Sequence, residues 1–238
     1  MDANEGLVRI HKNLKQFYRS NSPAWLRGSR AVNVIKGLLY KVLPKSIIYD
    51  QDFVVNVLDK PAAAAAPIIA GSVIRDFSPD SILDVGCGSG AMLSSFRDAG
   101  LIAKGFEFGD SALALCEERA LDVMKVDLRS PDIRTLPKGF NVALSMEVAE
   151  HLPPRSAAGY VELLCSSAPV IVFTAASPGQ GGTDHLNEQP MEYWMELFKR
   201  HSFYPDVHLA DSWRHEWKGS RKVVGWYIDN LMIFRLHK

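Results

Sequence analysis

SILDVGCGSG, at residues 81–90, is the stretch that decides the fold of this chain. A short apolar strand leads into three glycines at alternate positions, and residues 91–96 are predicted to begin a helix. Glycine has no Cβ, so it turns tightly and lets a bound molecule contact the backbone. The N-terminus of the following helix would face that molecule. The pattern predicts a nucleotide-cofactor site at the end of the first strand of an α/β sheet.

The glycine spacing alone leaves two cofactors open. Gly86-x-Gly88-x-x-Ala91 satisfies the dinucleotide fingerprint, so it does not separate NAD from S-adenosylmethionine. Asp84 favours S-adenosylmethionine, because a carboxylate beside the turn repels a pyrophosphate but suits ammonium and sulfonium charges. Glu107 ends the next apolar run and is suited to accept the ribose hydroxyl protons of either cofactor. We therefore expect S-adenosylmethionine, with NAD as the alternative.

Strand and helix patterns alternate along the chain. Strands are expected near 81–85, 102–107, 123–127, 141–146 and 169–175, separated by helical patterns at 90–99, 110–120 and 155–167. This alternation predicts a parallel sheet with helices on both faces. Apolar spacing predicts a further helix at 189–201, and residues 231–236 are expected to form the final strand.

A helix is also predicted immediately before the glycine-rich stretch, from Asp59 to Phe77. Asp59 is the expected N-cap and Pro61 falls in the first turn. Pro67 should kink or restart this helix. The segment 208–222 is instead interpreted as a loop that adds to a substrate lid.

Four motifs in order resemble class I S-adenosylmethionine-dependent methyltransferases. ILDVGCGSG at 82–90 is similar to their first motif, and GFE at 105–107 to their acidic second-strand motif. VMKVDL at 123–128 resembles the third strand, and NVALSMEVAEHL at 141–152 resembles the fourth strand with its Glu-Val-x-Glu-His-Leu signature. Within that family the chain looks like the small-molecule enzymes related to ubiquinone-biosynthesis O-methyltransferases.

The resemblance implies a Rossmann-like, seven-stranded methyltransferase sheet, mostly parallel, with an antiparallel last strand. It implies a helical N-terminal arm at 1–58 and a catalytic domain at 59–238. The cofactor should lie against the glycines, with Glu107 on the ribose and Asp127 near the adenine. The residues expected to bind it are Asp84, Gly86, Cys87, Gly88, Gly90, Glu107, Phe108, Asp127, Leu128 and Met146.

Two histidines are the candidate catalytic residues, because a hydroxyl acceptor must lose a proton near neutral pH. His151 follows the fourth strand, at the carboxyl edge where ligands bind. His185 lies in a glycine-rich loop after the fifth strand, which is expected to close over the substrate. For His151, capping of the next helix is the alternative role.

A metal site is left open by the same segment. Glu147, Glu150, His151 and His185 resemble the two-glutamate, two-histidine cluster with which small-RNA 2′-O-methyltransferases bind a divalent metal. Such an ion would polarise a substrate hydroxyl. Glu-x-x-Glu-His also recurs in methyltransferases where no metal is expected, so the motif does not decide the matter.

Charge is distributed unevenly although the formal net charge is zero. The segment 9–45 contains no acidic residue and is basic throughout, at Arg9, Lys12, Lys15, Arg19, Arg27, Arg30, Lys36, Lys41 and Lys45. It is interpreted as a cap docked on the catalytic domain, with an anionic or lipid-linked acceptor or a membrane surface as alternatives. Nucleic acid is the least favoured partner.

The three cysteines lack metal-ligand spacing, which favours reduced thiols in a cytoplasmic protein. No apolar run is expected to reach the roughly 18 residues that cross a bilayer, and no secretory segment is recognised. The most probable acceptor atom is a hydroxyl oxygen of a small molecule, with nitrogen as the alternative and a non-catalytic scaffold as a further one. The acceptor and the oligomeric state carry no readable pattern.

Overall fold

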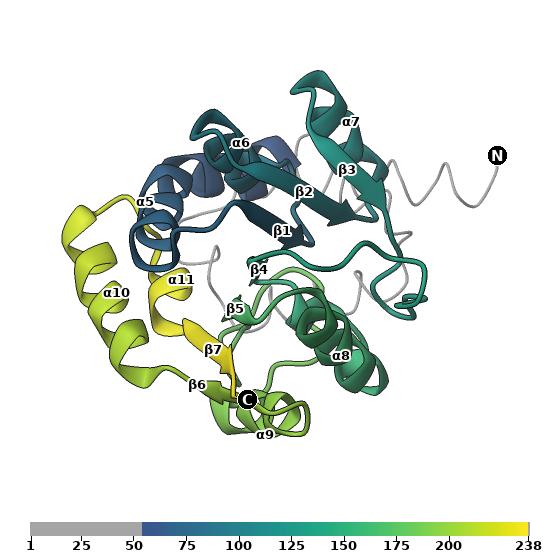
Figure 1. Cartoon of the computed structure of the whole chain (residues 1–238), viewed down its shortest axis with the longest axis vertical. Helices are drawn as coiled ribbons and strands as arrows, with labels where there is room; N and C mark the ends of the chain where they lie inside the picture. Colours follow the sequence, from purple (N-terminus) through teal and green to yellow (C-terminus); the bar gives the residue numbers. More distant parts are fainter. Residues whose placement is uncertain (1–53, 238) are drawn as a thin grey trace, which may run out of the picture. The chain divides into compact units, whose positions relative to one another are not determined.

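The computed structural model describes residues 54–237 (Figure 1). The basic segment 9–45 and the rest of the predicted arm up to residue 53 lie outside the described residues. The arm and the predicted boundary between residues 58 and 59 therefore stay predictions. Within the described part, a π-helical turn, η1 (Val54–Asp59), leads directly into α5 (Lys60–Phe77).

A seven-stranded sheet in the order β3-β2-β1-β4-β5-β7-β6 forms the centre of the fold. The strands are β1 (Ser81–Val85), β2 (Ile102–Glu107), β3 (Asp122–Lys125), β4 (Val142–Met146), β5 (Val170–Thr174), β6 (Phe203–Pro205) and β7 (Met232–Leu236). β1 to β5 pair in parallel, whereas β7 is antiparallel to both β5 and β6. The predicted sheet is thereby confirmed, including its antiparallel last strand.

The helices follow the strands as the alternation predicts. They are α6 (Ala91–Asp98), α7 (Asp110–Glu118), α8 (Ala157–Ser167), α9 (Met191–Lys199), α10 (Val207–Ser220) and α11 (Gly225–Asp229), with 3₁₀ turns η2 (Ala149–His151) and η3 (Pro154–Ser156). The short β6 and α11 are not predicted, because segments of three and five residues show little periodicity.

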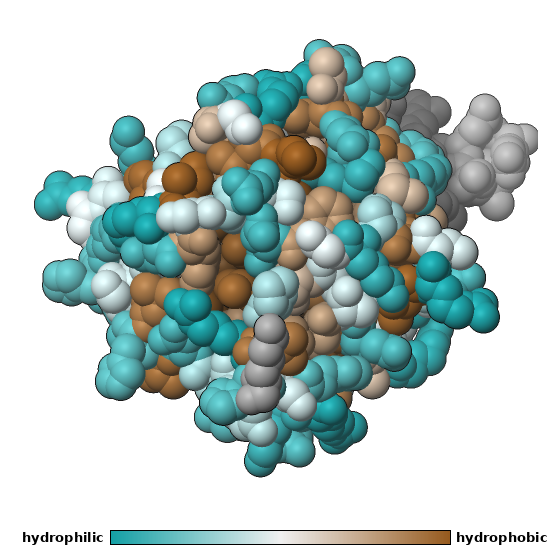
Figure 2. All heavy atoms as spheres, in the orientation of Figure 1, coloured by the Kyte–Doolittle hydropathy of each residue, from teal (hydrophilic) through white to brown (hydrophobic). Residues whose placement is uncertain are grey.

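Apolar side chains pack on both faces of the sheet. In β1, Leu83 and Val85 join a core formed with α8 and α9, whereas Ile82 joins a core formed with α5, α6 and α10. Successive side chains of a strand point to opposite faces, so a strand buried on both sides is apolar almost throughout. Figure 1 shows α8 and α9 on one side and α5, α10 and α11 on the other. The face drawn in Figure 2 is largely polar, with apolar patches between the polar side chains.

Asp59 is the N-cap residue of α5, as the sequence predicts, but its side chain makes no capping hydrogen bond to the helix. Its carboxylate accepts hydrogen bonds from the Arg119 guanidinium at 2.8 and 2.9 Å and from the Ser89 hydroxyl at 2.5 Å. Burial acts to raise the pKa of Asp59, but these hydrogen bonds outweigh it and lower the pKa. Arg119 also donates to the Ser89 carbonyl at 2.8 Å. The start of α5 is thus tied to the glycine-rich turn and to the end of α7.

Pro67 does not restart α5, which continues as one helix from Lys60 to Phe77. A proline inside a helix leaves the carbonyl of the fourth preceding residue without its N–H partner. That residue here is Ala63, and both it and Pro67 are exposed, so water can bind the carbonyl. The helix therefore continues past Pro67, because the missing backbone hydrogen bond lies on its solvent-exposed side.

The interpretation of 208–222 as a lid loop is wrong. Most of it is α10, and Trp213 and Trp217 are completely buried against α5. The Trp213 indole donates to Asp76 at 2.6 Å and that of Trp217 to Ser72 at 3.0 Å. Aromatic residues at helical spacing form core here and do not line a substrate lid.

One described stretch, Val54–Phe77, is long and apolar enough to cross a membrane by length and composition, with a mean hydropathy of 1.4. The expectation that no apolar run approaches such a length is therefore corrected. A core helix passes the same test. Ile69 and Val73 of this helix are completely buried in the core on one face of the sheet, and 33% of the apolar window is buried in all.

Gly90→Ala tests how tightly the turn is packed. Gly90 has φ +77°, and a Cβ there would collide with Leu121 Cδ1 and lie 3.1 Å from Cys116 Sγ. Gly100 has φ +88° with open space around it. We expect Gly90→Ala to lower the free energy of unfolding by about 1–3 kcal/mol more than Gly100→Ala, because only the former is overpacked. Urea denaturation measures both; equal losses would contradict the packing.

Candidate active site

Glycines occupy the turn after β1 because two features of that turn exclude side chains. Gly86, Gly88 and Gly90 have φ of +79°, +55° and +77°, a region that other residues rarely adopt. A Cβ at Gly86 would also lie 2.6 Å from Val148 Cγ2. The Gly86 N–H donates to the Phe106 carbonyl at 2.8 Å, which fixes the turn against β2.

Glu107, the last residue of β2, joins this turn to the loop that follows β2. One carboxylate oxygen accepts from the Phe108 and Gly109 N–H groups, each at 2.7 Å, and the other from the Gly88 N–H at 2.9 Å. A carboxylate offers about four acceptor sites. Three are used by backbone donors, so the side chain is held in one orientation with acceptor capacity left.

Asp84 lies at the end of β1 and is almost completely buried. Burial, and secondarily the negative charge of Glu107, raises its pKa to about 7. The carboxylate form is therefore costly in the site as it stands. A cationic group placed beside Asp84 would offset that cost.

Asp127, Phe108 and Arg129 lie together beyond β2 and β3. The Arg129 guanidinium donates to both Asp127 oxygens at 2.8 and 2.6 Å, and this hydrogen bonding lowers the pKa of Asp127. Its guanidinium carbon lies 5.0 Å from the centroid of the Phe108 ring, which is 45% exposed. An accessible aromatic face thus lies near a carboxylate at the carboxyl edge of the sheet.

Three further residues predicted to bind the cofactor have buried, uncharged side chains. Leu128 and Met146 are buried, and so is Cys87. Hydrogen bonding to the Cys116 thiol, together with burial, raises the pKa of the Cys87 thiol well above its usual value. These side chains contribute shape and not charge. The structure brings the predicted cofactor residues together at the carboxyl ends of β1, β2, β3 and β4.

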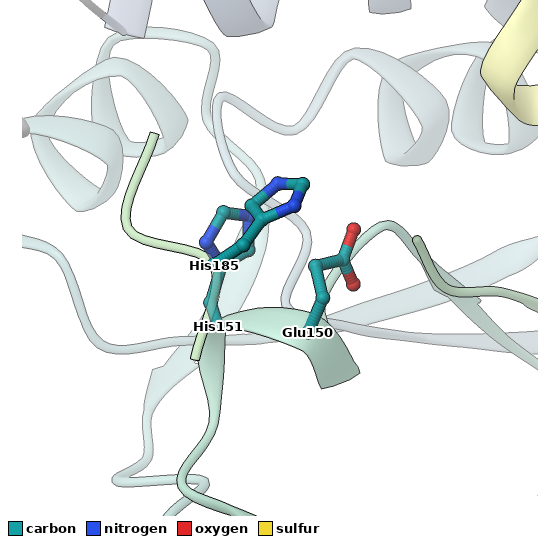
Figure 3. Close-up of side chains that lie close together, drawn as sticks. All are labelled: Glu150, His151 and His185. Carbon is teal, nitrogen blue, oxygen red and sulfur yellow. The ribbon is translucent and has the colours of Figure 1, made fainter. Parts of the chain in front are cut away.

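Glu150, His151 and His185 form a compact group beside η2 (Figure 3). One ligand atom from each side chain lies within 4.8 Å of the others. The two imidazole rings meet edge to face, with centroids 5.0 Å apart. Both candidate catalytic histidines predicted from sequence are therefore in direct contact, with the Glu150 carboxylate next to them.

Glu150 is completely buried, and neither carboxylate oxygen has a hydrogen-bond partner in the described part of the chain. Burial, followed by the negative charge of Glu147, raises its pKa well above the usual value. A buried acid without partners is rare in proteins and requires an explanation.

Backbone hydrogen bonds bring His185 to this place. The Leu186 and Asn187 N–H groups donate to the Glu150 carbonyl at 2.8 and 3.0 Å, so the loop after β5 lies against η2. His185 Nδ1 bonds to Glu188 Oε1 at 2.8 Å. If Nδ1 carries the proton, Nε2 is left as the acceptor nitrogen.

Glu188 organises the loop, and the sequence analysis missed it. Its oxygens accept from the Gly179 and Gly181 N–H groups at 2.8 Å as well as bonding to His185. Burial acts to raise the pKa of Glu188, but the hydrogen bonds from His185 and the glycines lower it. The sequence feature that could have identified Glu188 is its position three residues after His185, from which a carboxylate can reach the imidazole. The loop predicted as a lid is pinned in this structure by one side chain.

Glu147, the fourth residue of the predicted metal cluster, lies outside this group. Its φ is +55°, a left-handed conformation unusual for glutamate. Its two oxygens accept from Asn230 Nδ2 at 3.0 Å and from Gln180 Nε2 at 3.1 Å. Glu147 raises the pKa of Glu150 through its charge and through an interaction between the two side chains, while Asn230 and Gln180 hold Glu147 itself.

A family model described as a methyltransferase domain matches residues 60–218. The ubiquinone biosynthesis O-methyltransferase of Nitrosospira multiformis is 31% identical over 101 residues, covering 40% of this chain and 42% of that protein. Its counterpart in Nitrosomonas europaea is 28% identical over 127 residues, covering 51% and 50%. The chain thus spans about two fifths to half the length of these curated relatives.

Solved structures share the fold at low identity. The sugar N-methyltransferase KedS8 from Streptoalloteichus matches with a TM-score of 0.57 and 18% identity, covering 80% of this chain and 93% of that one. Magnesium protoporphyrin IX methyltransferase from Synechocystis, with bound S-adenosylhomocysteine, matches with a TM-score of 0.51 and 15% identity. This match covers 61% of this chain and 74% of that one. Since the family model matches well over half of its residues, this chain belongs to the methyltransferase domain family, as its resemblance to S-adenosylmethionine-dependent methyltransferases predicted.

Proposed function

We propose that this chain transfers a methyl group from S-adenosylmethionine to a hydroxyl oxygen of a small molecule. The observation that carries the proposal is the hydrogen bond from the Gly88 N–H to Glu107 at 2.9 Å. It sets the acid of β2 against the glycine turn of β1, where a nucleoside would bring its ribose. A sulfonium-activated methyl group is what the cofactor supplies when bound.

The site fits this cofactor in both charge and shape. Glu107 has acceptor capacity for ribose hydroxyls, and Phe108 offers an exposed ring for the adenine, with Asp127 nearby. Asp84 is buried beside the turn, where positive charge is favourable. The residues predicted from sequence to bind the cofactor keep those roles here as proposals.

The NAD alternative fits the fold less well. Dinucleotide-binding folds order their strands 3-2-1-4-5-6, whereas this sheet places an antiparallel β7 between β5 and β6. The buried Asp84 would also repel a pyrophosphate at the glycine turn. A non-catalytic scaffold would have no need to keep Glu107, Asp127 and the histidine pair together.

His151 and His185 are proposed to receive the proton of the acceptor hydroxyl. The bond from His185 Nδ1 to Glu188 leaves Nε2 as the acceptor nitrogen, on a ring that lies against Gly182, where a Cβ would collide with it. S-adenosylmethionine, when bound, would supply the methyl group, and the two imidazoles would be placed to take the proton that the acceptor hydroxyl loses. Holding the reactants in line can lower the barrier by about 7–11 kcal/mol.

Oxygen is preferred over nitrogen as the acceptor atom because the curated relatives are named O-methyltransferases. KedS8, which matches only in fold, is a sugar N-methyltransferase and keeps nitrogen as the second candidate. An anionic or lipid-linked acceptor, a peripheral membrane contact and a cytoplasmic location stay predictions from sequence.

Glu107→Ala tests the cofactor assignment. Loss of a charged acceptor should weaken S-adenosylhomocysteine binding by about 10- to 100-fold, since such hydrogen bonds contribute about 1.5–3 kcal/mol. Isothermal titration calorimetry measures the affinity, with Glu107→Gln as the conservative variant and thermal unfolding as a check on folding. Glu117→Ala, on the exposed side of α7, is the matched control and should bind normally. Unchanged affinity in Glu107→Ala would count against the assignment.

Asp84 predicts a pH dependence of stability in the ligand-free protein. Its pKa of about 7 in the folded protein lies above the value of roughly 3.9 expected when unfolded. Between these values the folded protein binds more protons, so its free energy of unfolding falls as the pH rises from about 4 to 7. Across this range the free energy of unfolding of Asp84→Asn should fall by about 2–4 kcal/mol less than that of the unsubstituted protein. Urea unfolding at pH 5 and pH 8 measures this change in both proteins. An equal change in the free energy of unfolding in the two proteins would refute the prediction.

The reaction itself is tested with methyl-labelled S-adenosylmethionine and a small-molecule extract. We expect a labelled product carrying an O-methyl group. His151→Ala and His185→Ala should retain S-adenosylhomocysteine binding and lose about 10²- to 10⁴-fold in kcat. His208→Ala, exposed on α10, is the control. Labelled nitrogen would contradict the preference for oxygen, and binding without any labelled product would support the scaffold alternative.

A further inference from the structure

The buried Glu150 carboxylate has no partner among the described residues, although an acid so placed normally has one. Two histidines supply the nearest ligand atoms, from η2 and from the loop after β5. The three side chains come from two segments 34 residues apart that Leu186 and Asn187 fasten together through the Glu150 carbonyl. The group is therefore assembled by the fold.

We infer that Glu150, His151 and His185 bind one divalent transition-metal ion. The inference rests on the proposed function and revises one part of it, because the ion would lie where the acceptor hydroxyl is expected. With an ion bound, the histidines would be its ligands, and the ion would ease loss of the hydroxyl proton in place of a free imidazole. Two imidazoles and one carboxylate form a ligand set that holds catalytic zinc and non-haem iron in proteins, with positions left for a substrate oxygen.

The distances allow this with a small adjustment. Zinc–nitrogen bonds are about 2.0–2.1 Å, so two ligands of one ion lie at most about 4.2 Å apart. The three ligand atoms here lie within 4.8 Å of one another. Small rotations of the side chains close the difference.

A further contact supports the assignment of His185. Metal-binding histidines commonly donate their other ring N–H to a carboxylate, which fixes the ring and its tautomer. His185 Nδ1 bonds to Glu188, and Glu188 is itself held by Gly179 and Gly181. The imidazole is thus positioned to present Nε2 to an ion.

The local charge also favours a cation. The negative charge of Glu147 acts on Glu150 from outside the group. Nitrogen ligands suit zinc, cobalt or iron better than magnesium, which prefers oxygen. The site should therefore select a transition metal over Mg²⁺.

Glu147 is excluded as a ligand, in contrast to the four-residue cluster that the sequence resemblance implied. Asn230 and Gln180 donate to its two oxygens, and Asn230 also bonds to Ser177 and Gln180. This network positions Glu147 next to the site. The expected ligand count is three protein side chains.

Cobalt provides a direct test on the full chain, because Co²⁺ bound to nitrogen and oxygen ligands absorbs visible light. After treatment with chelator, Co²⁺ titration should give a visible absorption band that saturates at one equivalent. Zn²⁺ should displace the Co²⁺, and excess Mg²⁺ should not. Absence of a saturable band, or displacement by Mg²⁺, would overturn the inference.

Variants assign the ligands. Glu150→Gln keeps the shape and is neutral, so the fold is retained; we expect it, like His185→Ala, to weaken Co²⁺ binding tenfold or more. Glu147→Gln should change the affinity by less than about threefold, and His208→Ala should leave it unchanged. Equal losses in Glu147→Gln and Glu150→Gln would overturn the three-ligand assignment. S-adenosylhomocysteine binding is measured in parallel, so failure of the metal inference is distinguished from failure of the proposed function.

Discussion

The Glu107 carboxylate is the contact on which the arrangement of the site depends. It accepts hydrogen bonds from Gly88 in the turn after β1 and from Phe108 and Gly109 after β2. Two loops that end neighbouring parallel strands are thereby fixed to one side chain. Because the glycines carry no side chain, the backbone of this turn is open to a ligand, and nothing lies within 4 Å of a Cβ built at Gly88.

Uncompensated negative charge is the second constraint. Asp84 and Glu150 are buried acids whose pKa values burial raises, and among the described residues neither forms an ion pair with a lysine or arginine. Such groups are costly until a cation arrives. The proposed sulfonium ligand lies next to Asp84, and the inferred metal ion lies next to Glu150. Under these two proposals, stability is given up at the places where positive charge would bind, which is a common compromise at functional sites.

Local patterns predicted most of the sheet and failed where long-range contacts decide the structure. The strands β1, β4 and β5 are short, largely apolar runs buried on both faces, so composition alone identifies them. Residues 208–222 are rich in polar and charged side chains and suggested a loop. The segment is helical instead, because Trp213 and Trp217 pack against α5 and donate hydrogen bonds to side chains of that helix.

The sequence by itself determined the strand–turn–helix at the glycines, the acid ending β2 and the order of the motifs, because each depends on neighbouring residues. Only the tertiary structure decided which distant groups meet. It paired Asp59 with Arg119 instead of a helix end, set His185 against His151, and held Glu147 with Asn230. These outcomes depend on hydrogen bonds between segments far apart in the chain, and no local pattern of residues encodes such partners.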